Sequence, residues 1–128
     1  MASILIVEDD AHVLRVLSMW LARHGHDLLE ARDGAQAREI LTNTQVDLLV
    51  SDVNMPRLNG LELVEWVRSH KSESLPMILL SSRCDQDAIA AELRKHDVRM
   101  HPKPFSPSRL VVEIEQLLAP SARSGTEP

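Results

Sequence analysis

Short apolar runs that alternate along the chain with helical patterns are the feature that most constrains the fold. The clearest runs are residues 4–7, 46–50 and 77–80. They lack the strict polar alternation of a half-exposed sheet, which is typical of strands buried on both faces of a parallel sheet. Two weaker candidates, 26–31 and 98–102, complete a set of five, and Pro102 favours an edge position for the last strand.

Each predicted strand is followed by a segment with apolar residues at three-to-four spacing, which predicts a helix. These segments are residues 10–24, 34–42, 60–69, 87–96 and 106–118. Parallel strands joined by helices require right-handed crossovers and helices on both faces of the sheet. The order therefore predicts an α/β fold, a three-layer α/β/α sandwich around a five-stranded parallel sheet.

The chain of 128 residues has the length of one compact domain, which we place at 1–119. Residues 120–128 are rich in Pro, Ser and Gly without apolar periodicity, and we expect a flexible tail or linker there. The only cysteine, Cys84, excludes an internal disulfide and a finger-type zinc site.

Composition also excludes several classes of partner. The formal net charge of −5 disfavours direct binding of this chain to nucleic acid or to anionic lipid. The apolar runs are far shorter than the roughly 20 residues of a membrane span, and the N-terminus lacks the pattern of a secretory signal. We therefore expect a cytoplasmic protein that does not enter a membrane.

Polar residues follow four of the predicted strands. Glu8 and Asp9 follow the first, Asp52 the third, Ser81 the fourth and Lys103 the fifth. Ligands of open α/β sheets bind beyond the carboxyl ends of the strands, where the strand order reverses. If the order is 2-1-3-4-5, the first and third strands are neighbours, and the three carboxylates converge.

Close carboxylates repel one another unless a cation neutralises them, and an oxygen-only, partly hydrated site suits Mg²⁺ better than zinc. The Ser81 hydroxyl and the Lys103 ammonium would then surround a phosphoryl group placed on Asp52. Phosphoryl transfer needs a nucleophile in line and charge neutralisation around the phosphoryl oxygens. The pattern therefore predicts Asp52 as the nucleophile of a phosphoryl site.

Taken singly, each of these residues has an ordinary structural explanation. Asp9 or Asp10 could cap the first helix, because carboxylates accept hydrogen bonds at helix N-termini. Asp52 and Ser81 could be loop or turn residues, and Lys103 a solvated charge. Their joint occurrence after four strands favours the phosphoryl site.

Four motifs resemble those of the receiver domains of bacterial two-component response regulators, and the resemblance covers residues 3–118. They are ILIVEDD at 4–10, DLLVSDVNMP at 47–56 with Gly60 after it, LSSR at 80–83 and KPF at 103–105. The resemblance implies a flavodoxin-like fold with strand order 2-1-3-4-5. It also implies a signalling switch and not an enzyme.

The resemblance further assigns roles to individual residues. It implies that Asp52 is the phosphoacceptor and that Mg²⁺ is bound directly by Asp9, Asp52 and the backbone carbonyl of Asn54, with Glu8 acting mainly through water. Ser81 and Lys103 would contact the phosphoryl group, and the bond between Lys103 and Pro104 is expected to be cis. The implied partners are a histidine kinase or phosphotransfer protein and a downstream effector domain or protein.

One position departs from the family pattern. Three residues before Lys103 the family commonly has Tyr or Phe, whereas this chain has Met100. Methionine is flexible and does not provide two distinct side-chain states, which puts the usual coupling to the fifth strand in doubt. The alternative is a degenerate receiver that acts as a protein-interaction module.

The sequence leaves room for two further alternatives. Aspartyl-phosphate hydrolases also begin with an aspartate after a strand but usually carry a second acid two residues later, where this chain has Asn54. Homodimerisation through the fourth and fifth helices is left open, because Leu110, Val111 and Ile114 are not all expected to face the sheet.

Overall fold

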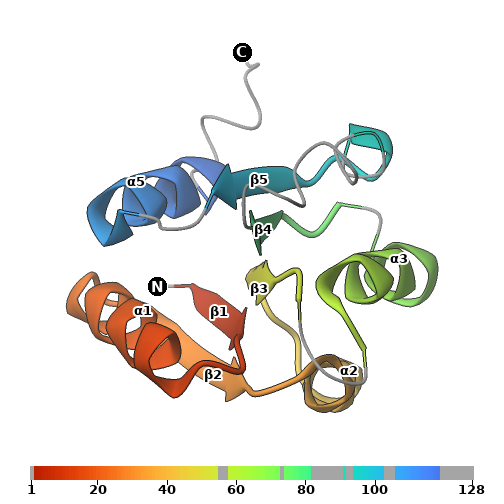
Figure 1. The fold of residues 1–128 in the computed structure, drawn as a ribbon, viewed down its shortest axis with the longest axis horizontal. Coiled ribbons are helices and arrows are strands. Elements are labelled where there is room, and N and C mark those ends of the chain that lie inside the picture. The colour runs from red at the N-terminus through yellow and green to blue at the C-terminus, as the bar shows by residue number, and fades with distance from the viewer. Residues whose placement is uncertain are drawn as a thin grey trace.

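A computed structural model describes residues 2–54, 58–72, 74–81, 91, 94–102 and 106–118. Its five strands form one parallel sheet in the order β2-β1-β3-β4-β5 (Figure 1). The elements are β1 (Ser3–Val7), α1 (Ala11–Arg23), β2 (Asp27–Ala31), α2 (Gly34–Asn43), β3 (Leu48–Asp52), α3 (Gly60–His70), β4 (Met77–Ser81), β5 (Arg99–Pro102) and α5 (Pro107–Leu118). The predicted fold class and strand order are confirmed, and β5 lies at the edge that Pro102 indicated.

The sheet separates two apolar cores, and the central strands contribute to both. Figure 1 shows α1 and α5 on one side of the sheet and α2 and α3 on the other. In β1, Ile4 and Ile6 pack in the core under α1 and α5, whereas Leu5 and Val7 pack in the core under α2 and α3. Because successive side chains point to opposite faces of a strand, a sheet covered on both sides needs unbroken apolar runs.

Three helices begin at polar side chains that accept hydrogen bonds from the first turn. Asp10 accepts from the amides of His12 and Val13 at the start of α1, and Asp33 caps α2. Asn59 forms a capping box with Glu62 at the start of α3. Asp10, and not Asp9, is therefore the cap of the first helix. The Asp9 side chain is not needed as that cap.

Three predicted strands begin later than expected: β3 starts at Leu48 and not at residue 46, and turn geometry explains the other two. β2 starts at Asp27 and not at His26, whose amide still donates to Leu21 O at the end of α1, directly after Gly25 with a positive φ of 84°. β5 starts at Arg99 and not at Val98, which follows Asp97 with a φ of 58°. In both cases a left-handed residue ends the preceding turn just before the strand.

Arg68 ties the end of α3 to the segment that leads into β5. Its guanidinium donates to the carbonyl oxygens of His96 at 2.8 Å, Ser72 at 3.2 Å and Asp97 at 3.5 Å. Burial lowers the pKa of Arg68, and the Asp97 carboxylate opposes that shift. The side chain thus satisfies carbonyl groups that the turn leaves without ladder partners, and it fixes where β5 begins.

Several predictions fall on residues outside the described ranges. Of the helix expected at 87–96, Ala91, Arg94 and Lys95 are described as helical. Cys84 and the tail at 120–128 lie outside. Within the described residues, no helix has the length and apolar character that crossing a membrane requires.

The expectation that the apolar residues of the last helix could not all face the sheet is wrong. Leu110, Val111 and Ile114 are all buried, in the core shared with α1. At 100° per residue these three positions fall within one sector of about 100°, which is the width of an ordinary buried helix stripe. They therefore give no support to a dimer interface, and the exposed apolar residue of α5 is Val112.

The burial of α5 predicts unequal costs for two neighbouring truncations. Ile114→Ala should lower the free energy of unfolding by about 2–5 kcal/mol, because it opens a cavity in the core. Val112→Ala, at a site 55% exposed, should change it by less than about 0.5 kcal/mol. Urea unfolding of both variants measures the difference, and equal values would contradict the described packing.

Candidate functional site

The acidic residues predicted to converge lie at the carboxyl ends of β1 and β3. The two strands pair in parallel with Val7 beside Ser51, so Glu8 and Asp52 come next to each other. Glu8, Asp9 and Asp52 each offer a carboxylate oxygen, and these oxygens lie within 4.8 Å of one another. Two residues that follow β1 and the last residue of β3, distant in sequence, thus share one small volume.

The three acids differ in their exposure to solvent. Glu8 is fully buried and Asp52 is 6% exposed, whereas Asp9 is exposed. The Glu8 carboxylate accepts a hydrogen bond from the Asp10 amide at 3.2 Å, which helps to hold it beneath the start of α1. Buried carboxylates in mutual repulsion favour binding of a cation, because desolvation makes each unneutralised charge costly.

The donor set fits Mg²⁺. All the available donors are oxygens, and the 4.8 Å limit is only slightly larger than the roughly 4.2 Å between opposite ligands at about 2.1 Å from an octahedral ion. A bound water can bridge the remaining gap, because magnesium usually keeps part of its hydration shell. The exposed Asp9 marks the side from which an ion can enter.

Ser81 lies at the end of β4, which pairs with β3 on the side away from β1. Asp52 pairs with Leu80, and the Val53 amide donates to Leu80 O at 3.0 Å. Ser81 follows directly and is fully buried. Within the described part of the chain its Oγ has no hydrogen-bond partner, which leaves a hydroxyl available to an incoming polar group.

The other predicted site residues are placed less completely. Asn54 lies two residues after Asp52 and is exposed. Pro102, the residue before Lys103, pairs with Ser81, but Lys103 itself lies outside the described residues, as do Pro104 and Ser82. Met100 is half-buried and packs against the core on the side of α2 and α3.

Two glycines allow the loop after β3 to pack against the site. A Cβ at Gly60 would lie 2.4 Å from Asp52 O, and one at Gly34 would lie 2.2 Å from Leu58 O. The Gly60 amide also donates to Val53 O at 2.8 Å. The start of α3 therefore rests on the backbone of the candidate phosphoacceptor. The role of Gly34 was not predicted, because its neighbour Leu58 is distant in sequence.

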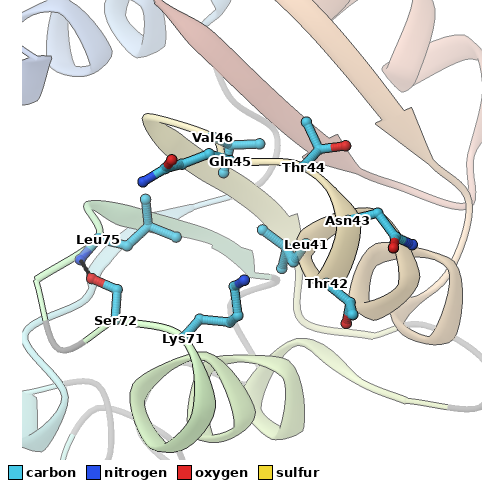
Figure 2. A pocket seen from close by; sticks show the side chains of 9 residues that line it. All are labelled: Leu41, Thr42, Asn43, Thr44, Gln45, Val46, Lys71, Ser72 and Leu75. Atoms are coloured by element: carbon cyan, nitrogen blue, oxygen red, sulfur yellow. Dashed lines mark hydrogen bonds between the residues drawn. The ribbon is translucent and has the colours of Figure 1, made fainter.

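A pocket lies at the other end of the strands, away from the acidic cluster, and its lining is different. Its volume is about 390 Å³, and its side chains come from the end of α2, the connection to β3 and the segment after α3 (Figure 2). Its lining residues are Leu41, Thr42, Asn43, Thr44, Gln45, Val46, Lys71, Ser72 and Leu75. No carboxylate or imidazole from the described residues lines it, so the acidic cluster is the stronger candidate.

Comparison with known proteins identifies the class that this fold and site define. The model of the response regulator receiver domain family matches residues 4–115, and the chain belongs to that family. Receiver domains are signalling switches of bacterial two-component systems and are not enzymes in the usual sense. Phosphorylation and Mg²⁺ binding at an acidic pocket are general features of the family.

Named relatives agree with this assignment. The chain is 35% identical over 125 residues to a chemotaxis protein CheY homolog of Campylobacter jejuni, covering 95% of this chain and 96% of the relative. It is 34% identical to the transcriptional regulatory protein GltR of Pseudomonas aeruginosa, covering 91% of this chain but 48% of that regulator. The chemotaxis response regulator CheY4 of Vibrio cholerae superposes with a TM-score of 0.84 at 28% identity, covering 92% and 99% of the two chains.

The close approach at Gly60 predicts that a single methyl group disturbs the site. Gly60→Ala should lower the free energy of unfolding by about 1–3 kcal/mol, because the new Cβ overlaps the Asp52 carbonyl. Helix propensity alone predicts the opposite sign, since alanine is about 1 kcal/mol better than glycine in a helix. Ser69→Ala, at an exposed position of α3, is the control and should be neutral or stabilising in urea unfolding.

Proposed function

We propose that this chain accepts a phosphoryl group on Asp52 in a Mg²⁺-dependent reaction and acts as a phosphorylation-controlled switch. The donor is the phosphohistidine of a histidine kinase or phosphotransfer protein, and the readout is altered affinity for a downstream effector. The observation that carries the proposal is the convergence of Glu8, Asp9 and Asp52 at the carboxyl ends of β1 and β3. The buried hydroxyl of Ser81 lies at the end of the neighbouring strand β4.

The reaction requires a carboxylate oxygen of Asp52 to attack the phosphorus of the donor. A new O–P bond forms while the bond between phosphorus and the donor nitrogen breaks, and the leaving imidazole retains the electron pair of that bond and takes a proton from solvent. Asp52 is 6% exposed, so its backbone and most of its side chain are held by the sheet while one edge faces the donor. Such positioning is the main protein contribution to phosphoryl transfer.

The same acids would hold the metal. Asp9, Asp52 and the backbone carbonyl of Asn54 are the proposed direct ligands, and Glu8 acts through water from its buried position. When bound, Mg²⁺ neutralises charge on the carboxylates and on the phosphoryl oxygens. Ser81 and Lys103 are proposed to donate hydrogen bonds to the remaining phosphoryl oxygens, a role that the unpartnered Oγ of Ser81 supports.

The central experiment is labelling with a small phosphodonor. Wild-type protein incubated with acetyl phosphate and Mg²⁺ should gain one phosphoryl mass in intact-mass spectrometry, and chelation of the metal should prevent the gain. Asp52→Asn should gain none, because an amide oxygen is a poor nucleophile. Asp27→Asn, at an exposed carboxylate at the other end of β2, is the control and should label normally. Equal labelling of the Asp52 variant would refute the assignment.

Metal affinity provides a separate test. Asp9→Asn should weaken Mg²⁺ binding about tenfold or more, because it removes an anionic ligand from a site of three carboxylates. Isothermal titration calorimetry in the absence of phosphodonor measures this directly. The Asp27→Asn variant should bind within about twofold of wild type. Unchanged affinity in the Asp9 variant would remove Asp9 from the ligand set.

The degenerate receiver remains the second candidate, and Met100 is the observation that favours it. Its side chain is half-buried against the core, where the family commonly has an aromatic ring that changes position. A thioether chain can fill that space in many conformations, so phosphorylation would then change the β5 face little. Equal partner affinity of the phosphorylated and unphosphorylated protein would favour this candidate over the switch.

A further inference from the structure

Arg32 begins the connection between β2 and α2, next to the acidic cluster. Ala31 is the last residue of β2, it pairs with Val7, and its carbonyl accepts a hydrogen bond from the Glu8 amide at 3.0 Å. Arg32 therefore leaves the sheet at the level where the acids begin. Its Nη2 lies 3.5 Å from the backbone oxygen of Asp9, so the guanidinium reaches across to the metal-binding side of the site.

The backbone under this side chain is held in place. The Arg32 amide donates to Gln36 Oε1 at 2.6 Å, and Asp33 accepts from the Gln36 amide at 2.8 Å as the cap of α2. Gly34 packs directly against the Leu58 backbone. Because the backbone at Arg32 is already ordered, less conformational entropy is lost when the guanidinium binds a ligand.

Arg32 forms no ion pair with any of the described residues. The residue is exposed, and among the described residues no carboxylate lies within 4.0 Å of its guanidinium. The contact with Asp9 O uses one of the five N–H donors of the group. The remaining donors have no recorded acceptor among the described residues, and they have the geometry to bind a planar or tetrahedral oxyanion.

Charge balance indicates what that anion is. The three clustered carboxylates carry three negative charges, of which a divalent ion offsets two. The role proposed above for Lys103 accounts for the third. A phosphodonor such as acetyl phosphate then brings two further negative charges that this balance leaves uncompensated. A cation at the rim of the site, close to the exposed Asp9, is placed to offset them.

We propose that Arg32 is a donor-binding residue, whose guanidinium contacts the phosphoryl oxygens of the incoming phosphodonor before transfer to Asp52. This inference rests on the function proposed above. Arg32 assists the approach and orientation of the donor and is not a ligand of the metal. Its contribution is therefore electrostatic and depends on the charge of the donor and on ionic strength.

The test compares Arg32→Ala, Arg32→Lys and the control Arg23→Ala, which removes the same charge at the opposite edge of the sheet, where α1 ends. Initial rates of labelling are measured with subsaturating acetyl phosphate and with the less charged phosphoramidate. At low ionic strength Arg32→Ala should label about fivefold more slowly with acetyl phosphate, and less than that with phosphoramidate. The difference should vanish near 0.5 M salt, where the screening length falls to about 4 Å. Arg32→Lys should restore part of the rate, and Arg23→Ala should match wild type.

Magnesium titration separates electrostatic from structural effects. Removing a positive charge near Asp9 should leave Mg²⁺ affinity unchanged or make it up to about twofold tighter. Parallel loss of metal affinity and labelling rate, or a rate loss that salt does not reduce, would overturn the proposal, because either would indicate a distorted site. If Arg32→Ala is labelled at the wild-type rate, the donor-binding role of Arg32 is overturned, while the labelling of Asp52 still supports the proposed function. Absence of label in the wild type would instead refute the function on which it rests.

Discussion

The parallel pairing of β1 with β3 is the constraint on which the rest of the site depends. It places Val7 beside Ser51, so the next residues on each strand, Glu8 and Asp52, meet at the sheet edge. A shift of one residue in this register would turn one of the two carboxylates to the opposite face. The register is maintained by apolar side chains that pack into two different cores, and neither core tolerates such a shift.

The site holds carboxylates close together, and packing around the site opposes their mutual repulsion. Two buried carboxylates and one exposed carboxylate share a small volume, where like charges repel and a bound cation would stabilise the cluster. The surrounding structure resists local relaxation, because Gly60 holds α3 against the Asp52 backbone and Gly34 holds the following loop against α2. The acids therefore remain together, as the proposed phosphoryl-accepting site requires.

The relatives place this domain in two contexts. The chemotaxis homolog is covered almost entirely by the match, whereas the transcriptional regulator GltR is covered to about half its length. A receiver can thus act by contacts of its own surface or through an attached effector region. Met100 is the position at which the β5 face of this chain departs from the family pattern.

The sequence alone determined the fold class and, through the family resemblance, the strand order, and it named the acids that the structure brings together. Unbroken apolar runs indicate strands with two covered faces, and family motifs mark the acids and the hydroxyl at their ends. Glu8, Asp9, Asp52 and Ser81 were all predicted before any geometry, because local patterns carry that information. Their roles remain predictions that the labelling and metal titrations test.

Only the tertiary structure decided how these residues are supported. It assigned the cap of α1 to Asp10, buried all three apolar residues of α5 in one stripe and placed Gly34 under Leu58. It also brought Arg32 to the carbonyl of Asp9, 23 residues away in sequence. Such contacts depend on how distant segments pack, and helical or strand periodicity reports which face is apolar but not which neighbour covers it.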